Sequence, residues 1–133
     1  MAFGKLPRTV EYALKILICL TIFAGRPLPA SAVATLARIP VSQASKVLNY
    51  LNLRGLTRSR RGSHGGYQLR TNPEGIYVKG VIELFQPVPE EDTATDPLSN
   101  VWSQMSARFW DDVENLTIAE LARRTAAQFE IAV

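Results

Sequence analysis

The chain has 133 residues, of which 47% are hydrophobic and 20% are charged, and its formal net charge is +3 at pH 7. This length and balance predict one small folded domain with an appended helical arm, and they exclude a disordered chain. A single cysteine excludes an internal disulfide framework and an all-cysteine metal site, and it agrees with a cytoplasmic location.

The charges are segregated along the chain. Between Tyr12 and Pro73 there is no Asp or Glu, whereas from Glu74 onward eleven acidic residues face four basic ones. The acid-free stretch carries nine basic residues: Lys15, Arg26, Arg38, Lys46, Arg54, Arg58, Arg60, Arg61 and Arg70. This arrangement indicates a first half that binds a polyanion, joined to a second half that does not.

The first predicted element is a helix from Thr9 to Ala24, ended by Gly25 and Pro27. Its apolar residues recur on nearly all faces, which is typical of a central helix packed on more than one side. Cys19 lies within it and is expected to be a small buried hydrophobe, with a redox role as the alternative.

The same region imitates a secretory signal. Lys5 and Arg8 precede the apolar run, and Ala30-Ser31-Ala32 resembles a cleavage site. Glu11 and Lys15 interrupt the run, however, and it is shorter than the roughly 20 apolar residues of a membrane span. We therefore expect neither export nor a membrane segment.

Two short helices are predicted next. The first covers Pro29 to Ile39, and the second begins at Pro40-Val41-Ser42 and runs to about Arg54. Two helices joined by a tight turn indicate a helix-turn-helix, although a plain helical hairpin has the same pattern. The polar residues of the second helix are the candidate readers of a DNA major groove: Ser42, Gln43, Ser45, Lys46 and Asn49.

A glycine-rich, basic hairpin follows. Arg60 to Tyr67 holds three glycines, two arginines and a histidine between strand-like pieces at Leu56–Ser59 and Tyr67–Arg70. Small residues allow a close approach to DNA and guanidinium groups bind phosphate or a narrow minor groove, although an ordinary surface hairpin is the alternative. The candidate DNA-contacting residues here are Arg58, Arg60, Arg61, Ser63, His64 and Tyr67.

In the order helix, turn, helix and basic wing, the chain resembles the Rrf-two family of bacterial transcription regulators, which includes the iron–sulfur cluster regulators. The residues that carry the resemblance are Tyr12-Ala13-Leu14, Ser42-Gln43-Ala44-Ser45-Lys46-Val47-Leu48, Leu51, Gly55-Leu56, Ser59 through Leu69 and the Ile76–Glu83 segment. The resemblance covers nearly the whole chain. It implies that Arg61 enters the minor groove and that Ser42, Gln43 and Ser45 read the sequence.

The second half is predicted to contain a helix from Tyr77 to Phe85, a flexible acidic loop at 86–97 and a long helix from Leu98 to Leu116. The long helix carries an apolar stripe at three- and four-residue steps: Leu98, Val101, Trp102, Met105, Phe109, Val113 and Leu116. A second copy of the chain would bury this stripe, and the resemblance implies the same dimerisation helix; a helix folded back on its own domain is the alternative.

A short last helix from Thr117 to Arg124 would be capped by Thr117, with Glu120 at the capping-box position. The predicted organisation is therefore a DNA-binding domain at 1–85, the loop at 86–97 and a dimerisation region at 98–133.

Many members of the Rrf-two family, which this chain resembles, hold an iron–sulfur cluster on three cysteines in the loop before the dimerisation helix. Residues 86–100 of this chain contain no cysteine, and Glu11, at the place of an extra acidic ligand in some relatives, cannot hold a cluster alone. We therefore expect a regulator without a cluster, metal or other cofactor.

The signal is left open by the sequence. A small-molecule pocket near Trp102, Met105, Phe109 and Trp110, a partner protein on the acidic half, and a redox response of Cys19 are the alternatives. No paired-carboxylate or nucleophile–base constellation is present, so no enzymatic activity is expected.

Together these features predict a mostly α fold with a small β-hairpin: a winged helix-turn-helix domain followed by a long dimerisation helix. The predicted function is a homodimeric, repressor-type transcription regulator that binds a palindromic operator in double-stranded DNA. A winged-helix module that binds protein instead of DNA is the alternative.

Overall fold

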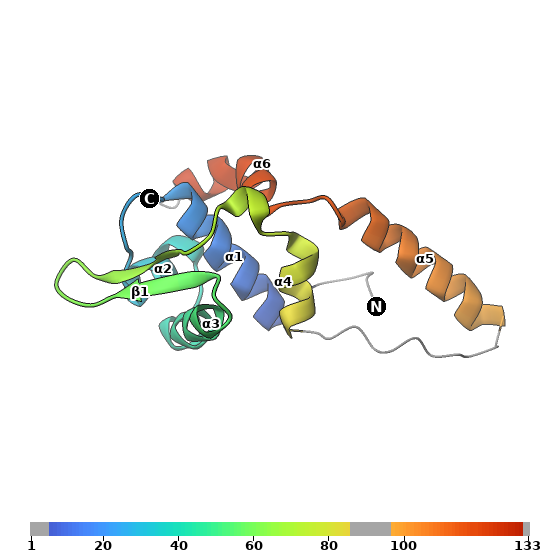
Figure 1. The fold of residues 1–133 in the computed structure, drawn as a ribbon, viewed down its shortest axis with the longest axis horizontal. Helices are drawn as coiled ribbons and strands as arrows, with labels where there is room; N and C mark the ends of the chain where they lie inside the picture. The colour runs from blue at the N-terminus through green and yellow to red at the C-terminus, as the bar shows by residue number, and fades with distance from the viewer. Residues whose placement is uncertain (1–5, 86–96, 132–133) are drawn as a thin grey trace.

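A computed structural model of the protein describes residues 6–85 and 97–131. The described part is mostly helical with one small antiparallel hairpin, so the predicted fold class is confirmed (Figure 1). The elements in chain order are α1 (Arg8–Ile22), α2 (Ala30–Ala37), α3 (Val41–Leu53), β1 (Thr57–Arg60), β2 (Gly66–Leu69), the short 3-10 helix η1 (Pro73–Gly75), α4 (Val78–Phe85), α5 (Pro97–Val113) and α6 (Ile118–Ile131).

Helix α1 is the centre of the core. Val10, Ala13, Ile16 and Leu17 are fully buried, and α1 contacts α2, α3, α4 and α6. The apolar residues that the sequence distributes around this helix are therefore buried by several neighbouring helices. Among the described helices, none is long and apolar enough to cross a membrane.

The turn between α2 and α3 is tight. Arg38 adopts a left-handed conformation with φ of 59°, and the N–H of Ile39 donates to the carbonyl of Ala34 at 3.0 Å. Pro40 is the N-cap of α3 and, having no N–H, leaves no donor unpaired there. No side chain caps α3, and Ser42 lies inside its first turn and is exposed.

The wing is anchored to the connection between α1 and α2. Strands β1 and β2 pair in antiparallel register, with Arg58 opposite Gln68 and Ser59 opposite Tyr67. Leu28 adds an isolated bridge: its N–H donates to the Tyr67 carbonyl at 2.8 Å, and the Tyr67 N–H donates back at 2.7 Å. The backbone of the wing is thereby held at its base from both sides.

Helix α5 extends away from the winged domain, and the chain then returns (Figure 1). The N–H of Val78 donates to the carbonyl of Leu116 at 2.9 Å, and the N–H of Ile118 donates to the carbonyl of Ile76 at 2.8 Å. Thr117 Oγ1 accepts from the N–H of Glu120 at 3.1 Å, which confirms the predicted cap.

Helix α6 packs along α1, with Ile118 fully buried. It continues beyond the predicted end at Arg124 to Ile131. The core of the winged domain thus includes a segment from the C-terminal part of the chain.

Gly66 is the position at which the fold depends on glycine. Its φ is +144°, and a Cβ there would overlap the backbone of Leu28 and Pro29. We predict that Gly66→Ala lowers the free energy of unfolding by on the order of 2 kcal/mol, because the strained φ and the overlap act together. Urea denaturation measures this change.

Gly80 provides the matched control for this prediction. It lies in α4, and nothing is within 4 Å of a Cβ built there. Gly80→Ala should stabilise the protein by about 0.5–1 kcal/mol, because alanine has the higher helix propensity. Equal stability of the two variants would contradict the proposed anchoring of the wing.

Candidate nucleic-acid interface

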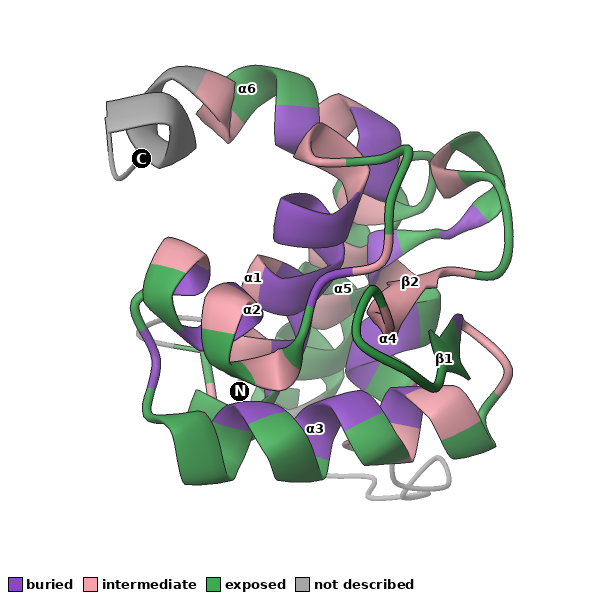
Figure 2. Ribbon diagram, turned by 90° about the vertical axis from the view of Figure 1, so that its left-hand side faces the viewer, coloured by how far each residue is buried: buried purple, intermediate pink, exposed green. Residues whose placement is uncertain are grey.

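Helix α3 presents a polar outer face. Its inner residues Ala44, Val47, Leu48 and Leu51 are buried in the core. All five of its predicted DNA-contacting residues are exposed: Ser42, Gln43, Ser45, Lys46 and Asn49. Figure 2 shows the exposed side of α3 along one edge of the domain, next to the hairpin. The helix therefore offers amide, hydroxyl and ammonium groups on the side away from the core.

The hairpin presents the guanidinium groups. Arg58 and Arg60 are exposed on β1, and Arg61, Ser63 and His64 are exposed in the tip between the strands. The tip is closed by a bond from the N–H of Gly65 to the carbonyl of Gly62 at 3.0 Å.

Arg58 has a cross-strand partner in Gln68. With the Gln68 amide oriented so that its oxygen faces the guanidinium, Oε1 accepts from Arg58 Nη2 at 2.9 Å and from Nε at 3.2 Å. This contact orients Arg58 along the hairpin, while its remaining donors stay available.

Tyr67 differs from the other candidates. Its side chain is half-buried and packs against the core, and its backbone forms the bridge to Leu28. The structure places Tyr67 at the base of the wing, where it supports the hairpin, and not among the exposed residues of the tip.

Helix α3 and the hairpin both carry positive charge. Helix α3 and strand β1 are in contact, and both lie within the stretch from Tyr12 to Pro73 that contains no carboxylate side chain. Exposed Lys46, Arg60 and Arg61 therefore meet no acidic neighbour from their own part of the chain. A surface with this charge and these donors is suited to the phosphates and base edges of DNA.

Helix α5 has an exposed apolar face near its start. Leu98, Val101, Trp102 and Met105 are 72%, 52%, 45% and 42% exposed, respectively. Toward the other end of the predicted stripe, Phe109, Val113 and Leu116 are half-buried. The prediction that Leu116 lies on the long helix is wrong, because α5 ends at Val113 and Leu116 packs against the core.

Comparison with known proteins agrees with this geometry. The Rrf2 family model, described as "Iron-dependent Transcriptional regulator", matches residues 6–124. This chain belongs to the Rrf2 (Rrf-two) family. As a member of that family with a helix-turn-helix fold, it is a DNA-binding transcription regulator.

Relatives and solved structures extend the comparison. A protein of Aquifex aeolicus (strain VF5), whose name classes it as an HTH-type transcriptional regulator, is 28% identical over 126 residues, which cover 85% of this chain and 88% of that protein. The structure of Staphylococcus aureus CymR is 27% identical, covers 87% of this chain and 96% of its own, and has a TM-score of 0.74.

Two further solved structures share the fold. CymR (YrzC), described as the global cysteine regulator of B. subtilis, has a TM-score of 0.81 at 23% identity, over 92% of this chain and 99% of that one. T. potens IscR has a TM-score of 0.79 at 19% identity, over 92% and 89%.

The family description names iron, but the donor residues of this Rrf2 protein do not fit an iron–sulfur cluster. The whole chain contains one cysteine and one histidine. Cys19 is buried in α1 and His64 is exposed in the wing tip, and within residues 6–85 and 97–131 no group of three His, Cys, Asp or Glu side chains is placed to hold a metal. Glu11 contacts Lys15 at 3.2 Å instead. A cluster requires thiolate or imidazole ligands that this set does not supply.

The structure also reveals residues that the sequence analysis missed. A cavity lies between α1, α3 and α4, and it is lined in part by Tyr50 and Phe85, whereas the predicted pocket was placed around the tryptophans of α5. Trp110 instead packs against the core under the Lys79 side chain. Gln43, Lys46 and Tyr50 recur at helical spacing, and that pattern is the sequence signal that Tyr50 shares a stripe of α3 with two of the predicted DNA-contacting residues.

Burial determines the chemistry of Cys19. Its side chain is fully buried, and burial raises the pKa of the thiol to about 12. Because the thiolate is the reactive form, we predict that iodoacetamide does not label folded protein near neutral pH and labels it readily in urea. Mass spectrometry of the intact protein measures the label. Rapid labelling of the folded protein would revive the redox role of Cys19.

Proposed function

We propose that this Rrf2 protein binds a palindromic operator as a homodimer, without an iron–sulfur cluster, and represses transcription by occupying the promoter. Helix α3 enters the major groove of each half-site, and the wing enters the adjoining minor groove. The observation that carries this proposal is the acid-free surface formed by α3 and the hairpin, with its polar and basic side chains exposed.

The roles of individual residues follow from their places. Ser42, Gln43 and Ser45 stand in the first turn of α3, from which short side chains reach base edges. Lys46 directly follows Ser45, Asn49 lies about one turn beyond it, and both suit phosphate or base contacts. Arg61 follows β1 directly, so its guanidinium is the leading group of the wing.

Dimerisation is supported by the length and the exposure of α5. At about 1.5 Å per residue, its 17 residues span about 25 Å, and its exposed apolar side chains lie at three- and four-residue spacing. The same face of a second copy would cover them in a two-fold arrangement. The resulting pair of α3 helices would match the two halves of a palindrome.

The proposal that no iron–sulfur cluster is bound rests on the donor set described above. The proposal that the protein represses transcription rests on its architecture. In the described residues, the winged domain and α5 account for all folded elements. A regulator built from these parts acts most simply by excluding other proteins from the DNA it covers.

Replacing Arg61 by Ala should weaken binding to DNA from upstream of the protein's own gene by on the order of 1 kcal/mol and reduce the preference for A·T-rich flanks. Fluorescence anisotropy at several salt concentrations measures both effects. Arg108→Ala is the matched control, because it removes the same charge from an exposed position on α5. If Arg61→Ala and the control bind alike, the wing does not enter the groove.

Replacing Val101 by Glu should convert the dimer into a monomer, because it places a charge in the centre of the proposed apolar interface. Sedimentation equilibrium gives the mass, and circular dichroism shows whether the helices are kept. Ser103→Glu adds the same charge at an exposed polar position of α5 and should remain dimeric. A dimeric Val101→Glu variant would mean that another surface holds the two copies.

A further inference from the structure

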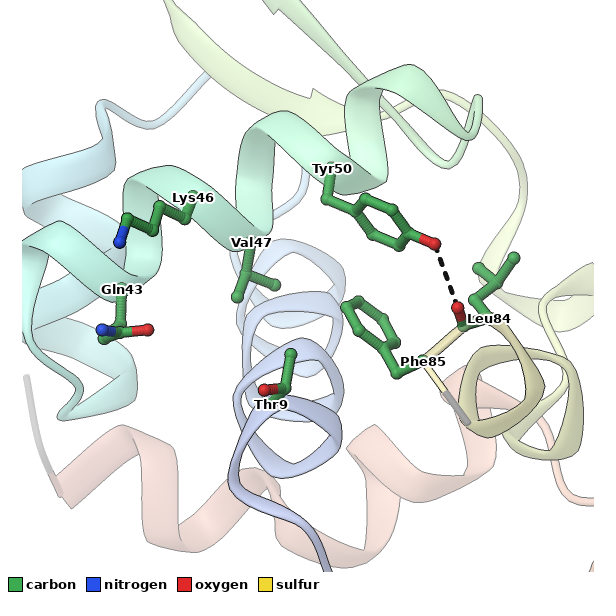
Figure 3. A pocket seen from close by; sticks show the side chains of 7 residues that line it. All are labelled: Thr9, Gln43, Lys46, Val47, Tyr50, Leu84 and Phe85. Atoms are coloured by element: carbon green, nitrogen blue, oxygen red, sulfur yellow. Dashed lines mark hydrogen bonds between the residues drawn. The ribbon is translucent and has the colours of Figure 1, made fainter. Parts of the chain in front are cut away.

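A cavity of about 380 Å³ opens beside the recognition helix. It lies where the start of α1, one side of α3 and the end of α4 meet, as Figure 3 shows. Its lining residues are Thr9, Gln43, Lys46, Val47, Tyr50, Leu84 and Phe85. This volume falls within the roughly 300–1,000 Å³ that small-molecule sites occupy.

The apolar part of the lining is an aromatic corner. The rings of Tyr50 and Phe85 have centroids 4.9 Å apart and are tilted by 52°. The Tyr50 hydroxyl donates to the carbonyl of Leu84 at 3.0 Å, and the Arg54 guanidinium lies 5.1 Å from the centre of the Tyr50 ring. These contacts hold the ring of Tyr50 in place, so the corner is formed before any ligand arrives.

The polar part of the lining selects an anion. Lys46 is the only charged residue among the seven that line the cavity. Gln43 and Thr9 add an amide and a hydroxyl, while the Tyr50 hydroxyl is already bonded to Leu84. An ammonium group beside two neutral donors at one end of the cavity, with an aromatic corner at the other, is complementary to an anionic group carried on a flat ring.

We propose that this cavity binds a small aromatic carboxylate, and that the bound carboxylate releases the protein from DNA. The second clause rests on the proposed function, because Gln43 and Lys46 are also among the residues assigned to the operator. A ligand carboxylate bound to the Lys46 ammonium neutralises the charge that would otherwise attract a DNA phosphate, and it repels that phosphate. A ligand seated against Gln43 and Lys46 therefore competes directly with the operator.

The same geometry gives a second effect of occupancy. Tyr50 joins α3 to the end of α4 through the bond to Leu84 and the contact with Phe85. A ring inserted between these side chains presses on both helices at once. Ligand binding would thus act on the position of α3 as well as on the charge of Lys46.

The probe for the first test is 2-naphthoate, with neutral 2-naphthamide as its uncharged counterpart. Isothermal titration calorimetry of the full chain without DNA measures binding to the cavity. We expect saturable binding of naphthoate at one site per chain, and at least about tenfold weaker binding of naphthamide and of naphthoate to Lys46→Met. Arg70→Met removes an exposed charge outside the cavity lining and should bind naphthoate like the wild type.

A cavity-filling variant separates the cavity from the DNA contacts. Thr9 is exposed at the start of α1 and is not among the proposed DNA-binding residues, so Thr9→Phe should fill the cavity and abolish naphthoate binding without removing a DNA contact. Circular dichroism confirms its fold. Naphthoate should displace labelled operator from the wild type and not from Thr9→Phe.

The outcomes distinguish the two proposals. No saturable naphthoate binding at millimolar concentration would overturn the cavity as an anion site, and so would binding by Lys46→Met and Thr9→Phe that is as tight as that of the wild type. If naphthoate binds in the calorimeter but does not displace a tightly bound operator, the proposed competition with DNA is overturned and the anion site is upheld. Calorimetric binding by a protein that shows no preference for any operator would uphold the site and count against the proposed function.

Discussion

The structure depends on the burial of α1. Because Ile16, Leu17 and their neighbours leave hardly any face of this helix polar, it is stable only when several other helices cover it. Helices α2, α3 and α4 cover part of its surface, and α6 must return from the end of the chain to cover the rest. This requirement determines the position of α5. Since the chain leaves at the end of α4 and re-enters at Ile118, α5 extends away from the core, with Leu98, Val101 and Met105 exposed and Trp110 packed against the core. The burial of α1 by α6 thus leaves an exposed apolar face on α5, which a second molecule would bury.

The net charge of the chain is modest, yet its basic residues are concentrated on one surface. The reason is that the acid-free stretch folds onto one side of α1. Helices α2 and α3 and the hairpin are consecutive in the chain, and all of them lie between Tyr12 and Pro73. The acidic residues with described partners lie outside α3 and the wing: Glu11 contacts Lys15 on α1, Glu120 contacts Arg123 and Arg124 on α6, and Glu74 of η1 contacts Arg123. Like charges are therefore gathered where α3 and the wing meet solvent, which favours association with a polyanion.

Much of this architecture could be predicted from local patterns, and the remainder depends on contacts between distant residues. Helical periodicity and the glycines of the hairpin predicted α1 to α5 and both strands to within a few residues, since these signals act over a turn or two. The short η1 was not predicted, and α6 continues from its predicted end at Arg124 to Ile131. The half-buried state of Tyr67 could not be predicted, because it results from pairing with Leu28, far back in the chain. The cavity was missed for the same reason: Tyr50 and Phe85 become neighbours only when α4 packs beside α3. The predicted acidic loop at 86–97 lies, apart from Pro97, outside the described residues.

The double hydrogen bond between Leu28 and Tyr67 has a consequence for how such a protein can change its target. Because backbone atoms set the position of the hairpin relative to α3, the reach of the wing does not depend on which side chains stand at its tip. The positions of Arg61, Ser63 and His64 are therefore free to vary without disturbing the frame that carries them. A lineage with this architecture can acquire a new preference for flanking DNA by single substitutions at the tip, at little cost in stability.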